Sequence, residues 1–291
     1  MSKMTRKLFL SILAVVLTVF ALGSTTFAWF TLTNSAEVEA FEAEIIASSG
    51  IEFAINTGGD PEELAWKTTL KAEDIEAYIV QQYTTFLFSD VTSSNGTSFS
   101  ALSGDASFLT IPLLFRSDNV DEIYWSAVEL VGENDTFTTR VPFTNEHNAD
   151  IEANGSFTVN PADAFRISMV GEIDASANVE VYENPEAGTN VVLGGITDSA
   201  APATGAVAYY EAVSGGKPLG SDSITVPSTI TTLGTGVHVL DLVSNENYGK
   251  LLGGDLTINI WFEGWDPNAY DSLLGLKIKT SFNFTGVDTD A

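Results

Sequence analysis

The sequence contains no cysteine, only 2 histidines, and only 12 Lys and Arg against 39 Asp and Glu. Without cysteine the chain forms no disulfide, no zinc–cysteine or iron–sulfur site, and has no thiol nucleophile. Proteins bind nucleic acids and anionic membranes through clustered basic residues. In this chain the few Lys and Arg residues are scattered along the sequence. The net charge of −27 therefore excludes nucleic acid as a partner and favours a soluble, strongly acidic surface.

Common catalytic motifs are also missing. The sequence has no Gly-x-Ser-x-Gly elbow, no phosphate loop, no dinucleotide fingerprint and no His-Glu-x-x-His pair. His147 lies in a polar turn, and alternation places His238 on the face of Leu240 and Leu242, which is typical of a core or rim residue. We expect the protein not to be an enzyme, although a Ser–His–Asp triad stays open because its members need not be adjacent.

The first 28 residues have the order of a secretory signal peptide. Lys3, Arg6 and Lys7 precede the apolar run Leu8–Leu22, and small residues follow up to Ala28. The apolar run is shorter than the ~20 residues of a membrane span. We expect cleavage after Ala28 by a signal peptidase; in the alternative, an uncleaved segment anchors the chain in the membrane.

Residues 29–291 predict one elaborated all-β domain, a jelly-roll-like antiparallel β-sandwich. Short runs rich in Val, Ile, Phe and Tyr are separated by Gly, Ser, Thr and Asn, as in sandwiches. Strict alternation in Ile51–Ile55 marks one strand, and the pattern changes phase between Ala40 and Phe41, which indicates a bulge. The other predicted strands are Phe108–Phe115, Ile123–Val131, Phe157–Val159, Phe165–Val170, Val179–Tyr182, Ala206–Ala212, Ser223–Val226, Val237–Val243, Leu256–Glu263 and Leu276–Phe284.

One or two helices interrupt the strands in the N-terminal third, between Asp60 and Tyr83. Asp60 is a suitable N-cap, because Pro61 follows it and Glu63 lies three positions later. Further on, an apolar stripe at helical spacing is expected to face the sheets: Ile75, Tyr78, Ile79 and Gln82.

Calcium is the candidate cofactor. Asp118, Asp121 and Glu122 place three carboxylates in one short segment between predicted strands, and hard oxygen ligands at this density suit Ca²⁺. No EF-hand loop is present, and an acidic solvated turn is the alternative interpretation.

Two tryptophans near two acids form the most distinctive internal segment. Trp261, Glu263 and Trp265 share one side of a regular strand, and Asp266 begins the turn that follows. Aromatic faces stack on sugar rings and acids accept hydroxyl protons, so these four residues are a candidate glycan-binding platform. In the alternative, the tryptophans cap the core of the sandwich.

The N-terminus also resembles a known family. Thr5–Lys7 and Ser24–Thr31 are similar to signal peptides processed by the SipW-type signal peptidase, as in the TasA/camelysin family of secreted Gram-positive matrix proteins. Segments similar to uncharacterised secreted proteins with that signal are Ile111–Asp118, Ala164–Ser168 and Ile260–Pro267. The resemblance implies a jelly-roll sandwich and, for TasA, extracellular fibres in which the mature N-terminal strand completes the next subunit. This chain differs in its acidity and its lack of Lys-rich strands, and it has no metal motif matching the protease activity described for camelysin.

Two hypotheses follow. In the first, the protein is a secreted surface or matrix component that self-associates into oligomers or filaments. Its assembly strand lies within residues 29–47, with these apolar anchors: Trp29, Phe30, Leu32, Val38, Phe41 and Ile45. The same segment could instead be the first strand of its own sandwich. In the second hypothesis, the protein is an adhesin that binds carbohydrate through the platform described above.

Overall fold

A computed structural model describes the residues that follow Ala40, with short gaps. The described ranges are 41–48, 50–83, 86–102, 104–185, 203–216, 224–274 and 276–289. The predicted signal segment and Trp29, Phe30, Leu32 and Val38 lie outside the described residues. Among those that are described, no helix has both the length and the apolar character needed to cross a membrane.

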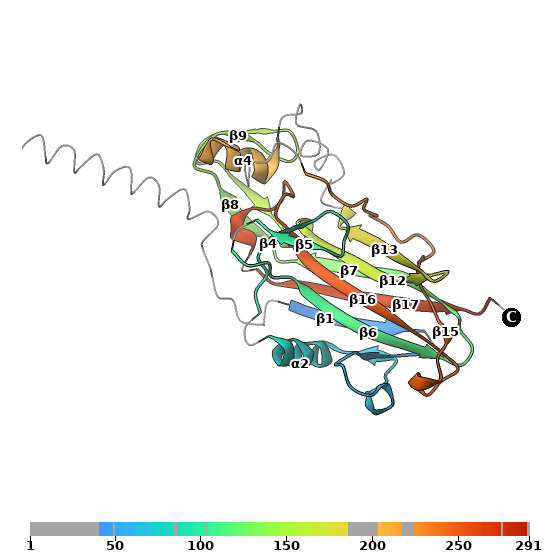
Figure 1. The fold of residues 1–291 in the computed structure, drawn as a ribbon. Helices are drawn as coiled ribbons and strands as arrows, with labels where there is room; N and C mark the ends of the chain where they lie inside the picture. The colour runs from blue at the N-terminus through green and yellow to red at the C-terminus, as the bar shows by residue number, and fades with distance from the viewer. Residues whose placement is uncertain are drawn as a thin grey trace, which may run out of the picture.

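The described strands form two main sheets, which confirms the predicted β-sandwich (Figure 1). The first sheet has the order β14 (Val237–Asp241), β7 (Glu122–Gly132), β17 (Ile278–Val287), β1 (Phe41–Ala47) and β3 (Thr69–Leu70). Its pairings are antiparallel except that of β1 with β17, which is parallel.

The second sheet is built around β16, the longest described strand. Side by side lie β13 (Ser176–Glu183), β12 (Phe165–Ile173), β16 (Leu252–Glu263), β6 (Leu109–Ser117) and β2 (Ile51–Ile55). Two short strands pair with the two ends of β16. One is β15 (Val243–Ser244). The other is β4 (Asp90–Ser93), which is parallel to β16 and also pairs with β5 (Phe99–Ala101).

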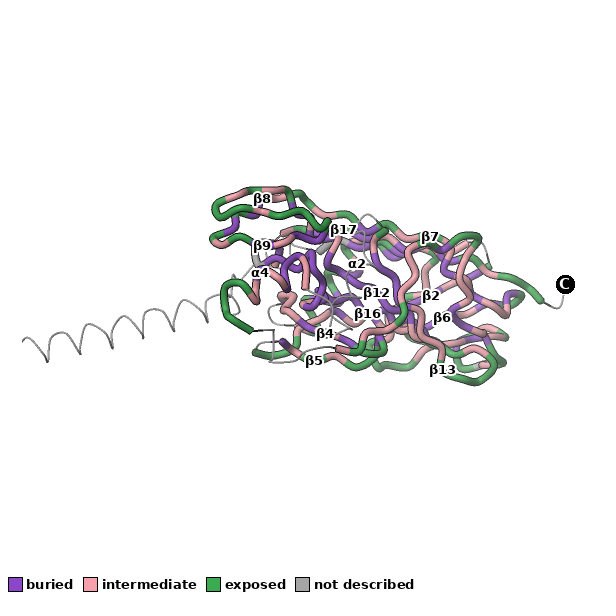
Figure 2. The backbone as a smooth tube through the Cα atoms, turned by 90° about the horizontal axis from the view of Figure 1, so that it is seen from above, coloured by how far each residue is buried: buried purple, intermediate pink, exposed green. Residues whose placement is uncertain are grey.

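The core lies between these two sheets, where Figure 2 shows the buried backbone. Alternation sends every second residue of a strand inward. Phe115 of β6 meets Phe284 of β17 edge to face at 5.2 Å, and Trp125 of β7 meets Tyr182 of β13 at 5.7 Å. All four rings are buried, and they join the sheets across the sandwich.

Helix α2 (Ala72–Gln82) follows a 3₁₀ turn, η2 (Pro61–Glu63), in the region where helices are predicted. The carboxylate of Asp60 accepts the Glu62 N–H at 3.0 Å, as expected of an N-cap. Ile75, Tyr78 and Ile79 are buried, whereas Gln82 is exposed. The predicted apolar stripe is therefore confirmed except at its last position.

Smaller elements cover one end of the sandwich (Figure 1). They are the pairs β8 (Asp135–Thr138) with β11 (Ser156–Val159) and β9 (Phe143–Thr144) with β10 (Asp150–Ile151), and helix α4 (Gly205–Ser214). The 3₁₀ turns not yet mentioned are η3 (Pro161–Asp163), η6 (Glu246–Tyr248) and η7 (Asp271–Leu273).

Two predicted strands are wrong. Ala206–Ala212 is part of helix α4, which buries Ala206, Val207 and Tyr209 and is followed by a C-cap residue, Gly215, with φ = 79°. Its Ala, Glu and Tyr residues have no strict alternation, and glycine is favoured just after a helix C-terminus. In the predicted strand Ser223–Val226, residues 224–226 have no strand pairing.

Candidate functional site

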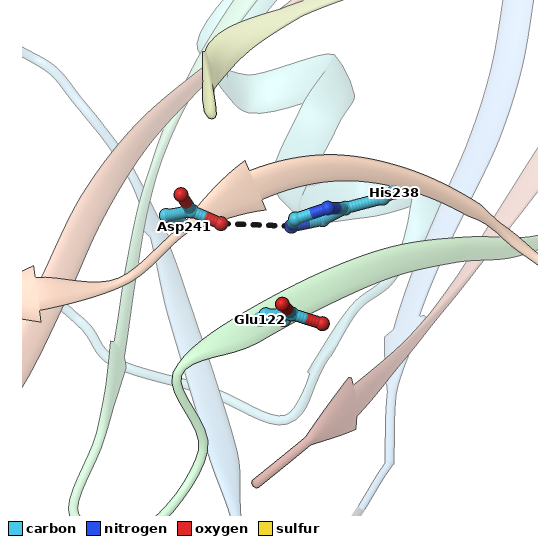
Figure 3. A group of neighbouring side chains, drawn as sticks. All are labelled: Glu122, His238 and Asp241. Atoms are coloured by element: carbon cyan, nitrogen blue, oxygen red, sulfur yellow. Dashed lines mark ion pairs between the residues drawn. The ribbon is translucent and has the colours of Figure 1, made fainter. Parts of the chain in front are cut away.

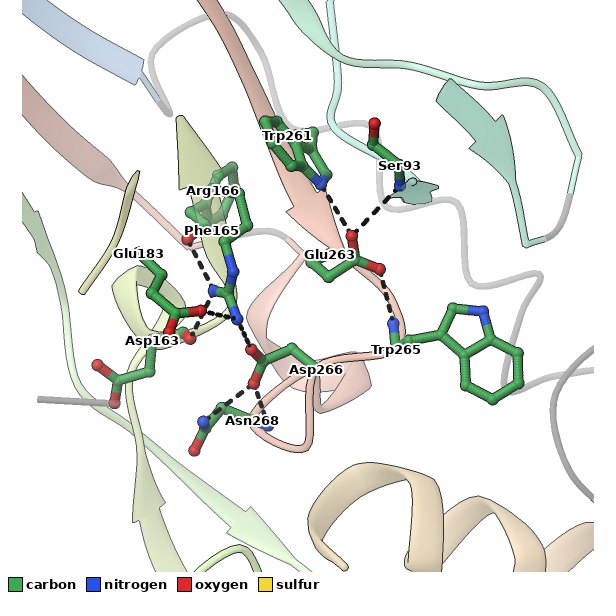
Figure 4. Close-up of polar contacts among 10 residues, drawn as sticks. All are labelled: Ser93, Asp163, Phe165, Arg166, Glu183, Trp261, Glu263, Trp265, Asp266 and Asn268. Atoms are coloured by element: carbon green, nitrogen blue, oxygen red, sulfur yellow. Dashed lines mark hydrogen bonds and ion pairs between the residues drawn. The ribbon is translucent and has the colours of Figure 1, made fainter. Parts of the chain in front are cut away.

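The four residues of the predicted glycan platform lie at the end of β16, beside a buried arginine (Figure 4). The guanidinium of Arg166 forms ion pairs with Asp266 and with Glu183, the latter at 3.0 Å, and donates to the Phe165 carbonyl at 3.0 Å. All three charged side chains are buried. Burial lowers the pKa of Arg166, but the attraction of the surrounding carboxylates outweighs it, so the net shift is upward.

Glu263 is held in the same region by N–H donors. One carboxylate oxygen accepts from the Trp261 indole at 3.0 Å and from the Ser93 amide at 3.4 Å; the other accepts from the Trp265 amide at 3.3 Å. Burial raises the pKa of Glu263, and the hydrogen bonds from Trp261 and Trp265, with the charge of Arg166, only partly oppose that shift. This carboxyl group therefore stays protonated at a higher pH than a free glutamate.

These positions correct the glycan-binding prediction. Trp261, Trp265 and Asp266 are 0% exposed and Glu263 is 2% exposed, so no ring face is available to a sugar. Trp261 packs against Phe99 at 5.2 Å, and Trp265 packs in an apolar cluster of its own. Alternation identified the shared side of Trp261 and Glu263 correctly, but it could not show that β4 and β5 cover that side. Both tryptophans are buried, as in the alternative interpretation, but in two small clusters apart from the main core rather than as a cap on it.

The buried charges fix the turn that follows β16. Oδ1 of Asp266 accepts the backbone N–H of Asn268 at 2.8 Å, while its other oxygen pairs with Arg166. Asp266 thus joins the turn to β12 and, through Arg166, to Glu183 at the end of β13. Removing one member of such a buried group leaves an unpaired charge, so the cluster has a structural role.

The predicted calcium ligands do not converge. Asp118 forms an ion pair with Lys250 at 2.6 Å, and this hydrogen bond lowers the pKa of Asp118. Asp121 accepts the backbone N–H of Thr289 at 2.9 Å and also its hydroxyl, which lowers the pKa of Asp121. The predicted set of Asp118, Asp121 and Glu122 is therefore wrong, because Asp118 and Asp121 lie in the turn between β6 and β7 and bind different partners, while Glu122 begins β7.

Glu122 instead meets two residues of β14 (Figure 3). The ligand atoms of Glu122, His238 and Asp241 all lie within 4.8 Å of one another, and this is the sole such group among the described residues. Nε2 of His238 is 2.8 Å from Oδ1 of Asp241. The contact lacks hydrogen-bond geometry, so this buried nitrogen has no hydrogen-bond partner among the described residues.

A β-bulge brings the two β14 residues together. His238 pairs with Tyr124 and Leu240 with Ile123, so β14 carries an extra residue, Val239. In a regular strand, residues three apart point to opposite faces; the extra residue puts His238 and Asp241 on one face. The prediction that His238 shares the face of Leu240 is wrong, because the apolar pattern gave no sign of the bulge.

Neighbouring groups orient all three side chains. The Tyr124 hydroxyl donates to Glu122 at 2.8 Å, and the Tyr124 ring stacks on the His238 imidazole at 4.9 Å with 16° between the planes. The backbone N–H of Asp174, in the turn between β12 and β13, donates to Oδ2 of Asp241 at 2.7 Å. Such outer contacts are typical of positioned metal ligands.

The predicted assembly strand is described only in its last part. Ile45 is fully buried in β1, which pairs with β17 along its whole length, and Phe41 is the first residue of that strand. From Phe41 onwards the segment is the first strand of its own sandwich, as the alternative interpretation predicts. A donated segment is thus restricted to the residues before Phe41.

Comparison with known proteins gives no relative. The chain matches no known family profile, no curated protein and no solved structure.

Proposed function

We propose that this chain is an exported structural protein of the cell surface or extracellular matrix of a Gram-positive-type bacterium. The observation that carries the proposal is the basic, apolar and small-residue order of positions 1–28 ahead of a strongly acidic, β-rich chain. The resemblance of that segment to TasA/camelysin signal peptides supports it. A sandwich held by packing and buried ion pairs, without cysteine, folds in an oxidising or a reducing compartment alike.

The export step is tested first. The full chain is produced in a Gram-positive host that carries a SipW-type signal peptidase, and the medium and the membrane fraction are analysed separately. We expect the protein in the medium, with N-terminal sequencing that begins at Trp29 or within a few residues. Recovery only from the membrane fraction, with residues 1–28 still attached, would contradict export by cleavage.

We further propose that the protein self-associates through the residues between Ala28 and Phe41. Trp29, Phe30 and Leu32 are apolar, and an extended segment with alternate apolar side chains can add as a strand to the sheet edge of another subunit. Because β1 fills its own sheet, the donated strand would precede β1 rather than include it.

The assembly step is tested by shortening the chain. Protein beginning at Trp29 is compared with protein beginning at Glu37, which lacks Trp29, Phe30 and Leu32 but retains β1. We expect oligomers or filaments of the longer form in negative-stain images, and unassembled, folded protein by circular dichroism for the shorter form. Equal assembly of both forms, or no assembly of the longer form in any ionic condition, would contradict this route. The export result stands or fails separately.

A further inference from the structure

We propose that Glu122, His238 and Asp241 bind a divalent transition-metal ion of the class to which Zn²⁺ belongs. The three side chains come from adjacent strands and offer one nitrogen and two carboxylates, and their ligand atoms already lie within 4.8 Å of one another. Ligand atoms about 2.0–2.2 Å from a tetrahedral zinc are separated by roughly 3.3 Å. Small side-chain rotations would therefore close the group around an ion.

The pairing of the strands is a second observation that points to a cation. Asp241 of β14 lies directly opposite Glu122 of β7, so two carboxylates face each other across the ladder. Like charges in directly opposed positions destabilise a sheet unless something between them offsets the repulsion. A bound divalent ion would do so, and it would also be a ligand partner for the buried Nε2 of His238, which contacts Asp241 but forms no hydrogen bond with the described residues.

The chemistry of the ligands selects the type of ion. Calcium takes six to eight oxygen ligands, and this group supplies two carboxylates and a nitrogen. Imidazole combined with carboxylate suits Zn²⁺ and its transition-metal neighbours. Three protein ligands leave a coordination position for water or for a group from another molecule.

The surroundings hold the ligands in place. Tyr124 donates to Glu122 and stacks on His238, and the Asp174 amide donates to Asp241, so each ligand has a contact outside the triad. Outer contacts of this kind fix ring and carboxylate orientation and strengthen metal binding. An ion here would join β14, the edge strand, to β7 at the bulge.

The rival interpretation needs no metal. A protonated His238 would form an ion pair with Asp241 and offset part of the carboxylate repulsion by itself. The two interpretations differ in one measurable property: only the metal site takes up one equivalent of Zn²⁺ in a manner that depends on His238.

The two histidines of the sequence provide a matched pair for this test. The exposed side chain of His147 lies 3.6 Å from Glu146, and within the described part of the chain it belongs to no group of three possible ligands. Purified full-length chain without an affinity tag is treated with chelator, dialysed, and titrated with Zn²⁺ by calorimetry, alongside H238A and H147A. We expect one equivalent bound by the wild type and H147A, and affinity lowered by far more than about tenfold in H238A.

Carboxylate variants complete the test. E122Q and D241N should each weaken Zn²⁺ binding at least about tenfold, while D118N, which alters a carboxylate paired with Lys250, should leave it unchanged. Zn²⁺ should raise the melting temperature of the wild type but not that of H238A, and circular dichroism would show that each variant is folded. Absence of one-equivalent binding, or one-equivalent binding that survives H238A, would overturn the proposal and leave the ion-pair interpretation.

Discussion

The guanidinium of Arg166 is closed off from water together with the carboxylates of Glu183 and Asp266. Buried charges are tolerated only when they are paired, and the loss of one partner leaves the others without compensation. Arg166 is therefore important for stability mainly because its removal would leave the two buried carboxylates without a cation.

We expect Arg166→Ala to lower the free energy of unfolding by about 3–5 kcal/mol, because Glu183 and Asp266 would lose their cation. The control is Arg116→Ala, which removes an 18%-exposed arginine paired with Glu52 and should cost clearly less. Urea unfolding followed by tryptophan fluorescence measures both. A smaller loss for Arg166→Ala than for Arg116→Ala would show that the buried cluster is not as described.

Glu263 gives the folding equilibrium a pH dependence of its own. Its pKa is raised in the folded state by burial, from a usual value of 4.5. The folded state therefore holds the proton more tightly than the unfolded chain. The contribution of this residue to stability is fully present below the unfolded pKa and is lost as the pH rises through the folded pKa.

Glu263→Gln removes this dependence, because the amide stays neutral at every pH. We expect the stability of the Gln variant relative to the wild type to increase as the pH rises from about 4 to about 7. Urea unfolding at a series of pH values measures the difference, with the exposed Glu44→Gln as control. A difference that stays constant across this range would mean that the Glu263 pKa is not raised.

At the level of single residues, the sequence showed which side chains are unusual but not whether they are exposed or covered. It identified Trp261, Glu263 and Trp265 as unusual, yet a solvent-facing side and a side covered by another hairpin have the same alternation. Likewise, Glu122 was predicted as a metal ligand, but its neighbours His238 and Asp241 lie more than a hundred positions away and meet it only through strand pairing.

At the scale of elements, β1 is the first described strand, and it follows the segment that we propose for assembly. It lies between β17 and β3, and its consecutive residues Ile45 and Ile46 are 0% and 37% exposed. The parallel pairing of β1 with β17 depends on contacts far apart in sequence, which local alternation does not contain.

We expect Ile45→Ala to cost about 2–5 kcal/mol of unfolding free energy, because it creates a cavity between the sheets. Ile46→Ala removes the same atoms from the opposite face of the strand and should change stability by about 0.5 kcal/mol or less. Thermal and urea unfolding of the two variants makes the comparison. Equal effects would mean that β1 is not held in its own sheet.

The bulge in β14 depends on a close approach from the second sheet. A Cβ atom at Gly171 of β12 would lie 2.2 Å from the carbonyl oxygen of Val239, the extra residue of the bulge. Sequence alternation alone cannot reveal this, since the contact joins two sheets.

We therefore expect Gly171→Ala to lower stability by about 1–3 kcal/mol, the usual cost of overpacking. Gly59→Ala is the control, because nothing lies within 4 Å of a Cβ at that position and its φ needs no glycine. Differential scanning calorimetry of both variants tests the idea. If the melting temperature of Gly171→Ala equals or exceeds that of the wild type, β12 and β14 do not approach each other in this way.

At the scale of the whole molecule, the strand pattern predicted the sandwich because short alternating runs fit two packed sheets. It failed at Ala206–Ala212, where a short apolar segment is compatible with a strand or a helix and packing at one end of the sandwich decides between them. The order of the strands in each sheet rests on long-range pairings that local patterns do not contain.

The net charge of −27 is likewise a property of the whole chain, and it opposes both compact folding and association of identical subunits. Salt shortens the range of this repulsion from about 30 Å at 0.01 M to about 8 Å at 0.15 M. We expect the melting temperature to rise, and any oligomers to increase, as the NaCl concentration is raised across this range. Calorimetry and analytical ultracentrifugation measure the two effects.

MgCl₂ at matched ionic strength is the control. General screening predicts a similar shift in melting temperature for both salts, whereas a much larger shift with Mg²⁺ indicates specific binding to carboxylates. A melting temperature that falls as salt is added would mean that the dispersed ion pairs outweigh the repulsion, and the acidic surface would then not limit assembly.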